Sequence, residues 1–268
     1  MSTLSNFHTH STFCDGKNTP EEIVKAAIAK DFSAIGFSGH GYTSFDLRYC
    51  MKDTEGYVAE ISRLKEEYDG IIPIFLGTEE DAFAPVDRGR YDYIIGSSHY
   101  YHLNGKYLPI DSSFDYFSRC LEAFENDLPR MAETYYSNFC SYINKRKPDI
   151  IGHFDLITKF DELGAPYFTG TPEYRKIAEK YALEALKSDC IFEVNTGAIS
   201  RGFRTTPYPG EDMLYVLKKH DAKLILSSDS HAADTLDFEF EEMKRYLYDF
   251  GFRKAFTLTV DGFTSYRL

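Results

Sequence analysis

The chain has 268 residues, of which 43% are hydrophobic, and a formal net charge of −12 at pH 7. Nucleic-acid binding needs a basic surface that neutralises phosphates, so this acidity disfavours a DNA or RNA substrate. The five cysteines are scattered and show no CxxC spacing, which argues against a disulfide framework and against a thiolate metal site. The N-terminus lacks a basic segment and a long apolar run, and no apolar stretch is long enough for a bilayer, so we expect a soluble cytoplasmic protein without membrane contact.

Short apolar runs alternate with helical patterns along the whole chain, which is typical of βα units around a parallel sheet or barrel. No Ser-rich or low-complexity stretch marks a linker, so we expect one α/β domain that spans residues 1–268. A further strand of open placement is expected at 255–260. The seven predicted strands cover residues 4–8, 34–38, 71–77, 92–97, 149–153, 190–195 and 223–228.

Helices are predicted between these strands. Thr19 offers an N-cap, Pro20 suits the first helical position, and Glu22 completes a capping box, so a helix should begin here. The interval 101–147 is long for one connection, and we expect an insertion there, a loop followed by a helix over 128–144, which could cover a site. Further amphipathic patterns cover residues 54–68, 172–187 and 238–248.

Most of the eight histidines lie at or just beyond the C-terminal end of a predicted strand. In a parallel barrel these strand ends converge on one face, where active sites are built from separate loops. His220 lies instead at the predicted exit of a helix, where a surface cation near the C-terminal dipole accounts for its presence. For His102, in the loop after His99, a structural role competes with a functional one. The strand-end histidines are His8, His10, His40, His99, His153 and His231.

Spacing and carboxylates strengthen this pattern. Residues two apart in an extended chain point to the same side, so His8 and His10, and likewise Asp229 and His231, can each aim two ligands at one cavity. Imidazole with carboxylate and without thiolate suits zinc, manganese, iron or cobalt. Pleating should place neighbouring acids on opposite faces, so only one of the pair at 79–80 can be a ligand. Asp15 closely follows the first histidine pair. The end of strand three should supply further carboxylates at the level of the histidines, namely Glu79, Glu80 and Asp81.

The order of the motifs resembles the polymerase and histidinol phosphatase (PHP) superfamily, and within it the L-histidinol-phosphate phosphatases. The resemblance covers nearly the whole chain and implies a distorted TIM-like barrel of seven βα units. The motifs that carry it are His8-Thr9-His10-Ser11, Ser38-Gly39-His40, Gly77-Thr78-Glu79, Gly96-Ser97-Ser98-His99-Tyr100, Ile151-Gly152-His153-Phe154-Asp155, Glu193-Val194-Asn195-Thr196 and Ser228-Asp229-Ser230-His231.

The resemblance also implies three divalent metal ions, a bridged pair and a third ion. A bridged pair can lower the pKa of a shared water and neutralise phosphoryl oxygens during in-line displacement. The first ion would take His8, His10, Glu79 and Asp229, the second Glu79, His99 and His153, and the third Asp15, His40 and His231.

Residues around the metals are expected to hold the substrate. Arg201 and Arg204 are the candidates for a bidentate phosphate clamp. Asn195 is expected to hydrogen-bond the substrate, and His102 is a candidate for substrate contact or for the leaving-group acid. Asp229 could accept a proton from the attacking water, because a carboxylate bound to a metal through one oxygen keeps the other free.

The predicted reaction is hydrolysis of a small phosphate monoester. L-Histidinol phosphate, hydrolysed to L-histidinol and phosphate in histidine biosynthesis, fits best, because an acidic, aromatic-rich cavity suits its ammonium and imidazole groups. The chain carries 21 Tyr and 22 Phe, although most of these should build the core. The alternatives are a phosphoesterase for a nucleotide or sugar phosphate, a metal-binding module without turnover, and an amide hydrolase. The oligomeric state stays open.

Overall fold

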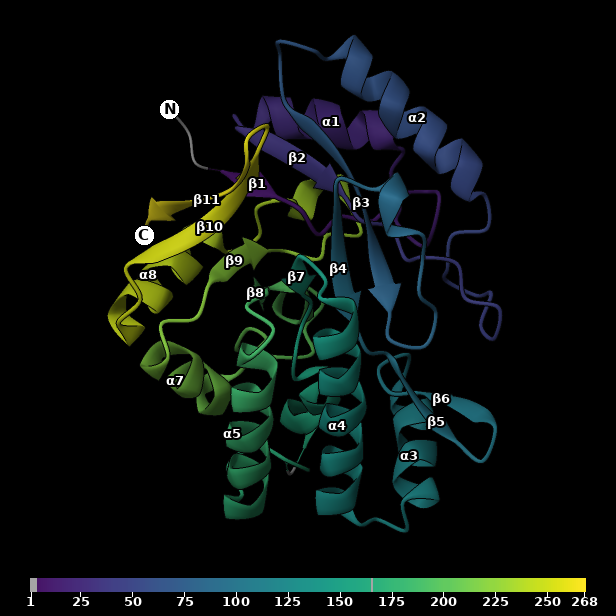
Figure 1. Cartoon of the computed structure of the whole chain (residues 1–268), viewed down its shortest axis with the longest axis vertical. Coiled ribbons are helices and arrows are strands. Elements are labelled where there is room, and N and C mark those ends of the chain that lie inside the picture. Colours follow the sequence, from purple (N-terminus) through teal and green to yellow (C-terminus); the bar gives the residue numbers. More distant parts are fainter. Residues whose placement is uncertain (1–3, 165) are drawn as a thin grey trace.

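The computed structural model describes residues 4–164 and 166–268, and a nine-stranded sheet forms its centre (Figure 1). Neighbouring strands run parallel except for the last pair, which is antiparallel. This sheet with its outer helices confirms the predicted α/β class. In spatial order the strands are β1 (Ser5–Asn6), β2 (Ala34–Phe37), β3 (Ile74–Asp81), β4 (Tyr93–Ser97), β7 (Ile150–Ile151), β8 (Ile191–Asn195), β9 (Leu224–Ser227), β10 (Lys254–Thr259) and β11 (Gly262–Arg267).

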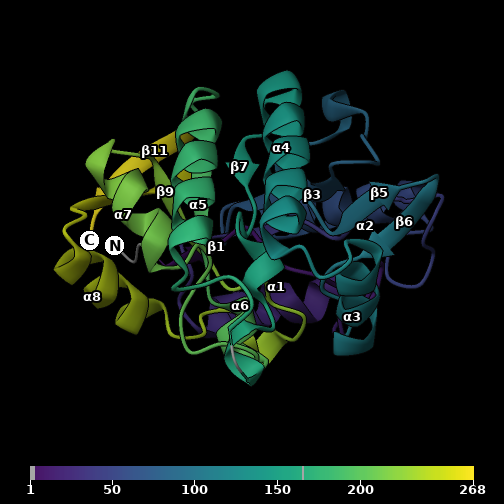
Figure 2. The same cartoon turned by 90° about the horizontal axis from the view of Figure 1, so that it is seen from below.

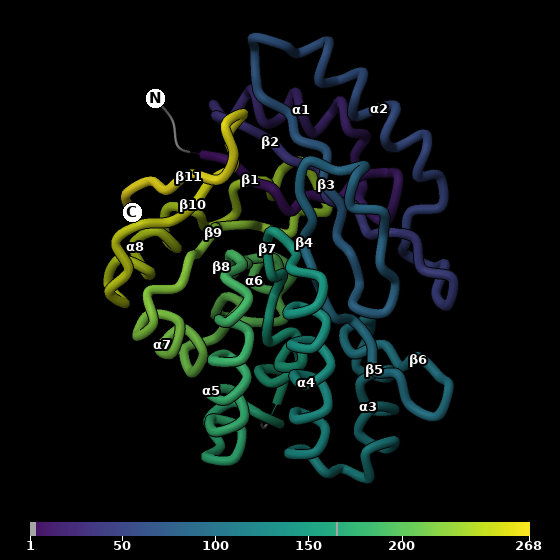
Figure 3. Tube along the Cα trace, in the orientation of Figure 1, coloured from purple at the N-terminus to yellow at the C-terminus, as the bar shows by residue number. Residues whose placement is uncertain are grey.

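The first and seventh βα units meet beyond the ends of β1 and β9. Thr9 and Ser230 form an isolated parallel bridge, in which His10 N donates to Ser230 O at 2.8 Å and Ser230 N donates to His8 O at 3.0 Å. Among the described residues, this bridge is the backbone pairing that joins the two ends of the parallel sheet. At the opposite end of β1, Ser5 Oγ lies 2.9 Å from Thr257 Oγ1 of β10, and the trace shows these two strands side by side (Figure 3).

Helices cover the outside of the sheet, with α1 and α2 against β2 and β3, and α4 beside α5 (Figures 1 and 2). At the start of α1 both capping-box bonds form, since Glu22 N donates to Thr19 Oγ1 and Thr19 N donates to Glu22 Oε2. In the described part of the chain, no helix combines the length and apolarity needed to cross a bilayer. The helices are α1 (Pro20–Ala29), α2 (Thr54–Glu67), α3 (Phe114–Ala123), α4 (Leu128–Arg146), α5 (Pro172–Leu186), α6 (Gly197–Ser200), α7 (Glu211–Lys219) and α8 (Phe240–Phe250), with short 3-10 turns at Arg88–Arg90, Leu156–Thr158, Asp161–Leu163 and Ala233–Thr235.

The insertion differs from the prediction in its first half. The helix expected over 128–144 is present as α4, but the expected loop contains a hairpin of β5 (Tyr100–Leu103) and β6 (Lys106–Pro109), followed by α3. Asn104 and Gly105 turn this hairpin with φ of 50° and 75°. An Asn-Gly pair is the preferred two-residue hairpin turn, because both positions need positive φ. The hairpin was therefore readable from the sequence.

Strand three also differs. It was predicted over 71–77 but spans Ile74–Asp81, so its three acidic residues lie within the strand rather than after it. Acidic residues are disfavoured in buried strands unless they are paired. Here the histidines and an arginine pair with them, and such partners come from distant segments. Helix α7 ends at Lys219 with His220 as its C-cap, as the predicted helix exit at His220 implies, although no range was predicted for it. Strand β11 was not predicted, whereas the expected tail strand is β10.

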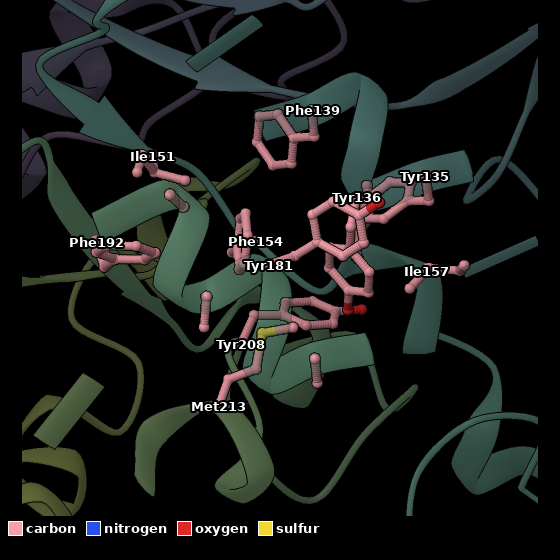
Figure 4. Close-up of a cluster of buried hydrophobic side chains, with 14 of the residues drawn as sticks. Tyr135, Tyr136, Phe139, Ile151, Phe154, Ile157, Tyr181, Phe192, Tyr208 and Met213 are labelled. Atoms are coloured by element: carbon pink, nitrogen blue, oxygen red, sulfur yellow. The ribbon is translucent and has the colours of Figure 1, made fainter. Parts of the chain in front are cut away.

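Aromatic side chains build much of the core, as the composition predicts. Tyr136 and Phe139 of α4 pack on Phe154 with ring centroids 5.4 and 5.5 Å apart, and Phe154 packs edge-on against Phe192 of β8 at 5.6 Å (Figure 4). Inside the sheet, Tyr93 is 1% exposed and donates its hydroxyl to Phe7 O at 2.6 Å. These contacts fix the strands whose C-terminal ends carry the histidines.

Candidate metal centre

The C-terminal ends of the parallel strands bring the six strand-end histidines together, as the strand-end argument predicts. The ring centroids of His8 and His153 lie 5.8 Å apart, and those of His99 and His153 lie 5.1 Å apart. On the other side of the cluster, His10 lies 4.4 Å from His40 and 4.0 Å from His231. Residues more than 200 positions apart in the sequence thus share one site.

Four side chains surround the first candidate metal position. His8 Nε2 lies 3.4 Å from Glu79 Oε2 and 3.6 Å from Asp229 Oδ1. His10 Nε2 lies 3.7 and 3.1 Å from the same two oxygens. Ligands at about 2.1 Å from one tetrahedral ion are about 3.4 Å apart, so the spacing fits a divalent ion.

Three of these four donor atoms have no hydrogen-bond partner. Among the described residues, His8 Nε2, His10 Nε2 and Glu79 Oε2 are fully buried and make no hydrogen bond of normal geometry, although His40 Nδ1 lies 2.8 Å from Glu79 Oε2. A buried polar atom without a partner costs free energy, and native structures keep few of them. One cation in their midst would satisfy all three at once, so the residues present fit a metal ion.

The second candidate position uses the other oxygen of Glu79. Glu79 Oε1 lies 2.9 Å from His153 Nε2 and 3.3 Å from His99 Nε2. The two oxygens of one carboxylate therefore face two different groups of histidines. This is the arrangement that a bridging ligand between two metals requires.

The third candidate position lies around Asp15. Asp15 Oδ1 is 3.7 Å from His40 Nε2, 3.5 Å from His231 Nε2 and 3.7 Å from His10 Nδ1. His40 also turns Nδ1 toward Glu79 Oε2 at 2.8 Å, so its ring lies between this group and the first. Four groups of neighbouring donors that could hold an ion occur here among the described residues, and they share members.

Two further carboxylates orient the histidine rings, and the sequence analysis did not assign them. Glu193 Oε1 lies 2.5 Å from His8 Nδ1, and its Oε2 accepts from His153 N at 2.8 Å. Asp81 Oδ2 accepts from His99 N at 3.0 Å and lies 3.2 Å from His99 Nδ1. Metal-binding histidines commonly donate their second ring nitrogen to a carboxylate. Glu193 stands in one of the identified motifs and Asp81 among the carboxylates of strand three, so that rule was the available signal.

The buried carboxylates give the histidine cluster a negative potential that favours a cation. Burial raises the pKa of Glu79, but the charges of His40 and His8 outweigh burial and hold it well below its usual value. Burial lowers the pKa of His8, yet Glu193 and Asp229 raise it well above its usual value. Burial, together with His231 and His40, lowers the pKa of His10 to about 3. The carboxylates are thus ionised and His10 is neutral, as metal ligation requires. The raised pKa of His8 reflects the negative charge of the surrounding carboxylates, which a bound metal ion would balance.

A cavity of about 430 Å³ opens above the histidines. Its floor includes Glu79 and Asp229, and ligand sites commonly have this size. The wall opposite comes from the loop after β2, from the insertion and from the segment after β7. Except for Tyr100, which follows His99 in its motif, no strand-end pattern points to these wall residues, which is why the sequence analysis missed them. They include Tyr49, Tyr100, Asp111, Ser112, Leu156 and Lys159.

Of the four predicted substrate residues, Arg201 lines the cavity and the other three do not. Arg204 is 5% exposed and donates to Thr158 and, at 3.0 Å, to Thr206, in a separate cavity. Asn195 is fully buried and donates to Glu193 Oε2 at 2.9 Å, so it positions an orienting carboxylate. His102 lies on the outer face of the β5–β6 hairpin, where its exposed ring stacks on Tyr107 at 4.5 Å.

Asp229 is held through both of its oxygens. Oδ1 faces the first candidate position, while Oδ2 accepts from Arg201 Nη2 at 2.9 Å. Arg201 Nη1 also donates to the backbone oxygen of Asp229 at 2.9 Å. Burial raises the pKa of Asp229, but Arg201 and His8 hold it well below its usual value. The oxygen that was expected to be free therefore accepts a hydrogen bond from Arg201.

Comparison with known proteins places this site in a family. The PHP domain profile matches residues 6–197, which include seven of the nine candidate ligands. The chain belongs to the PHP domain family. Among curated relatives, a Bacillus subtilis protein named "Histidinol-phosphatase" is 27% identical over 259 residues, covering 87% of this chain and 96% of its own. A Schizosaccharomyces pombe protein named "Probable histidinol-phosphatase" is 27% identical over 263 residues, covering 90% and 84%.

A solved PHP-type structure shares the fold. The histidinol phosphate phosphatase from Lactococcus lactis, crystallised with zinc, L-histidinol and phosphate, superposes with a TM-score of 0.72 at 19% identity. The match covers 98% of this chain and 99% of that one. The likeness therefore extends beyond residues 6–197 to the C-terminal strands that supply Asp229 and His231.

Proposed function

We propose that this PHP-family chain is a metal-dependent phosphatase that hydrolyses L-histidinol phosphate to L-histidinol and phosphate, a step of histidine biosynthesis. The observation that carries the proposal is Glu79, whose two oxygens face two histidine groups at 2.9 to 3.7 Å. Two curated relatives that span most of the chain are named as histidinol-phosphatases. The Lactococcus lactis enzyme that shares the fold was crystallised with zinc and with both products of that reaction.

Three divalent ions are proposed, drawn from zinc, manganese, iron and cobalt. The first would be held by the group around His8, the second by the pair His99 and His153 with Glu79, and the third by the group around Asp15. When bound, divalent ions supply Lewis-acid activation of water and neutralisation of phosphoryl oxygens. Three unpaired buried donors in the first group support occupancy of that position most directly.

Arg201 is proposed to hold the phosphoryl group. It lines the cavity beside Asp229 and next to His231, where Nη1 lies 3.4 Å from His231 Nδ1. A guanidinium has five N–H donors in a planar fork, and Asp229 takes two of them. The others can donate to phosphate oxygens. Arg204 is not proposed for this role, because it donates hydrogen bonds to Thr158 and Thr206 and pairs with Glu162 outside the cavity.

The organic part of the substrate would lie against the aromatic and acidic wall. Tyr49 and Tyr100 offer ring faces and edges to an imidazole or an ammonium group. Burial raises the pKa of Asp111, but Lys159 and the nearby histidines lower it below its usual value, so this carboxylate is charged near neutral pH. An aminated aromatic alcohol phosphate suits such a wall better than a sugar phosphate does.

The test is a phosphate-release assay on protein reconstituted separately with zinc, manganese, iron and cobalt. L-Histidinol phosphate is compared with a sugar phosphate, a nucleoside monophosphate and a generic aryl phosphate by kcat/KM. We expect a clear preference for L-histidinol phosphate, and His99→Asn and His153→Asn should lose metal and turnover together. Equal kcat/KM values on all esters would support a phosphatase but contradict the assignment of L-histidinol phosphate as its substrate. No turnover with fully bound metals would favour a binding module.

A further inference from the structure

Lys159 is a buried cation in the active cavity whose role the metal centre leaves open. It follows the 3-10 turn after His153 of the β7 segment and lines the cavity with 9% of its surface exposed. Lysine is rarely buried to this extent unless it is paired or functional. Its position brings an ammonium group to the cavity that His99 and His153 also line.

The ammonium group is held firmly in place. Lys159 Nζ donates to the backbone oxygen of Asp111 at 2.7 Å and lies 3.5 Å from Asp111 Oδ2. It also lies 4.7 Å from the ring centroid of Phe203 and 5.8 Å from that of Phe160. The segment before Asp111 is tied to the metal centre, because Ile110 N donates to His99 O at 2.9 Å. Lys159 is therefore positioned relative to His99 by two hydrogen bonds in series.

We propose that Lys159 is the general acid that protonates the leaving oxygen of the phosphate monoester, an inference that rests on the proposed phosphatase function. The bond from phosphorus to that oxygen breaks, and its electron pair passes to the oxygen. The proton moves from Nζ to the oxygen and releases an alcohol. The attacking water supplies the new oxygen of phosphate, and solvent water returns a proton to the amine.

Other donors along the described cavity wall suit this role less. The hydrogen bond from Arg48 holds the pKa of Asp46 below its usual value, so that carboxyl is ionised near neutral pH. Tyr100 donates its hydroxyl to Asp46 Oδ2 at 2.9 Å. Arginine does not release a proton at such pH values. Two tyrosines of the cavity wall remain as competitors. Tyr49 packs edge-on against His40 at 4.6 Å, beside the third candidate position, and Tyr208 packs edge-on against His153 at 6.2 Å.

The phosphate and the leaving group would then be held by two different cations, from the loops after the neighbouring strands β8 and β7. Arg201 lies on the β9 side of the cavity, where it is bound to Asp229. Lys159 lies on the insertion side, where it is bound to Asp111. A phosphoryl group at the metals and Arg201 would direct its ester oxygen toward Lys159 and the insertion wall.

The test is leaving-group dependence, measured on metal-loaded wild type, Lys159→Met and Lys159→Arg. General acid catalysis typically contributes about 10²- to 10⁴-fold, and only when the leaving group needs a proton. For an alkyl ester such as L-histidinol phosphate we expect kcat to fall about 100-fold or more in both variants. For an aryl ester with an acidic phenol, kcat should change little. Lys159→Arg keeps a charge but does not release a proton, so charge alone should not rescue the alkyl ester.

A binding measurement separates this role from phosphate binding and from structure. The Kd of inorganic phosphate, measured by calorimetry, and the metal content should match wild type in both variants. Lys187→Met, on the solvent-exposed end of α5, is the matched control and should behave as wild type on every ester. If Lys159→Met does not fold, Lys159→Arg carries the same comparison.

Several results would overturn the proposal. Equal losses on alkyl and aryl esters, a phosphate Kd weakened as strongly as kcat, or full alkyl-ester activity in Lys159→Arg would each exclude an acid role for Lys159. A selective alkyl-ester loss in Tyr49→Phe or Tyr208→Phe but not in Lys159→Met would assign the acid to that tyrosine. If wild type hydrolyses no ester, the proposed function itself fails and the acid role with it.

Discussion

Glu79 and Glu80 are neighbours in β3, yet their side chains serve opposite faces of the strand. Glu79 Oε1 lies 2.9 Å from His153 Nε2, whereas Glu80 Oε2 accepts from Arg146 Nη2 at 2.6 Å. Glu80 also accepts from Tyr142 and from Val86 N, so it links α4 to the loop after β3. Successive side chains of a β-strand point to opposite faces, so only one of these two neighbours can be a metal ligand.

This alternation predicts opposite phenotypes for two matched variants. Glu79→Gln should lose bound metal and lower kcat on the order of 100-fold or more, because several kcal/mol of charge stabilisation depend on the metals. Glu80→Gln should keep the wild-type metal content but lower the free energy of unfolding by about 2 kcal/mol, since half-buried Arg146 loses its charged partner. Elemental analysis and urea denaturation measure the two effects. Metal loss in Glu80→Gln alone would reverse the assignment.

Glu193 should matter for metal affinity although it is not a candidate ligand. Its Oε1 lies 2.5 Å from His8 Nδ1 and fixes the orientation of that ring. Removing such an orienting partner typically costs about 10- to 100-fold in metal affinity or activity. We expect Glu193→Gln to weaken metal binding by this factor in a chelator competition. Glu184→Gln, an exposed change on α5, serves as the control, and equal affinities in both variants would contradict the role.

Arg201 and Arg204 should separate phosphate binding from stability. Hydrogen bonds to charged groups are worth about 1.5–3 kcal/mol, so Arg201→Met should weaken the binding of inorganic phosphate about 10- to 100-fold. Arg204→Met should leave the phosphate Kd near wild type and lower the melting temperature, because buried Asp155 loses a nearby cation. Calorimetry and thermal unfolding distinguish the two. A phosphate Kd weakened in Arg204→Met but not in Arg201→Met would assign the phosphate clamp to Arg204.

The pair Asp46 and Arg48 predicts an acid-sensitive contact at the cavity rim. The hydrogen bond from Arg48, together with that from Tyr100, holds the pKa of Asp46 below its usual value. Because the folded pKa lies below the unfolded value of about 3.9, the stabilisation is complete above about pH 4 and is lost as the pH falls through the folded pKa. Arg48→Met should raise the pKa of Asp46 toward its unfolded value in an NMR titration. An unchanged pKa would show that Arg48 is not its cause.

The sequence predicted the parts of this protein that depend on local pattern and on strand polarity. Apolar runs of four to eight residues located seven of the eight parallel strands, although the third begins at Ile74 and ends at Asp81 rather than spanning 71–77. Such runs are what a buried strand requires. Histidines at the ends of these runs had to meet, since parallel strands direct their C-terminal ends to one face. The capping box at Thr19 formed for the same local reason. Alternation of side chains separated Glu79 from Glu80.

Only the tertiary structure decided which residues line the cavity, orient the metal ligands or pair with one another over long distances in the sequence. Arg201 and Arg204 are three residues apart and chemically alike, yet one lines the cavity and the other is buried against Thr158 and Glu162. The carboxylate that orients His8 is Glu193 rather than a residue near it in the chain. Lys159 and Asp111 meet across 48 positions. Such pairings depend on the packing of whole segments, which no local pattern of residues encodes.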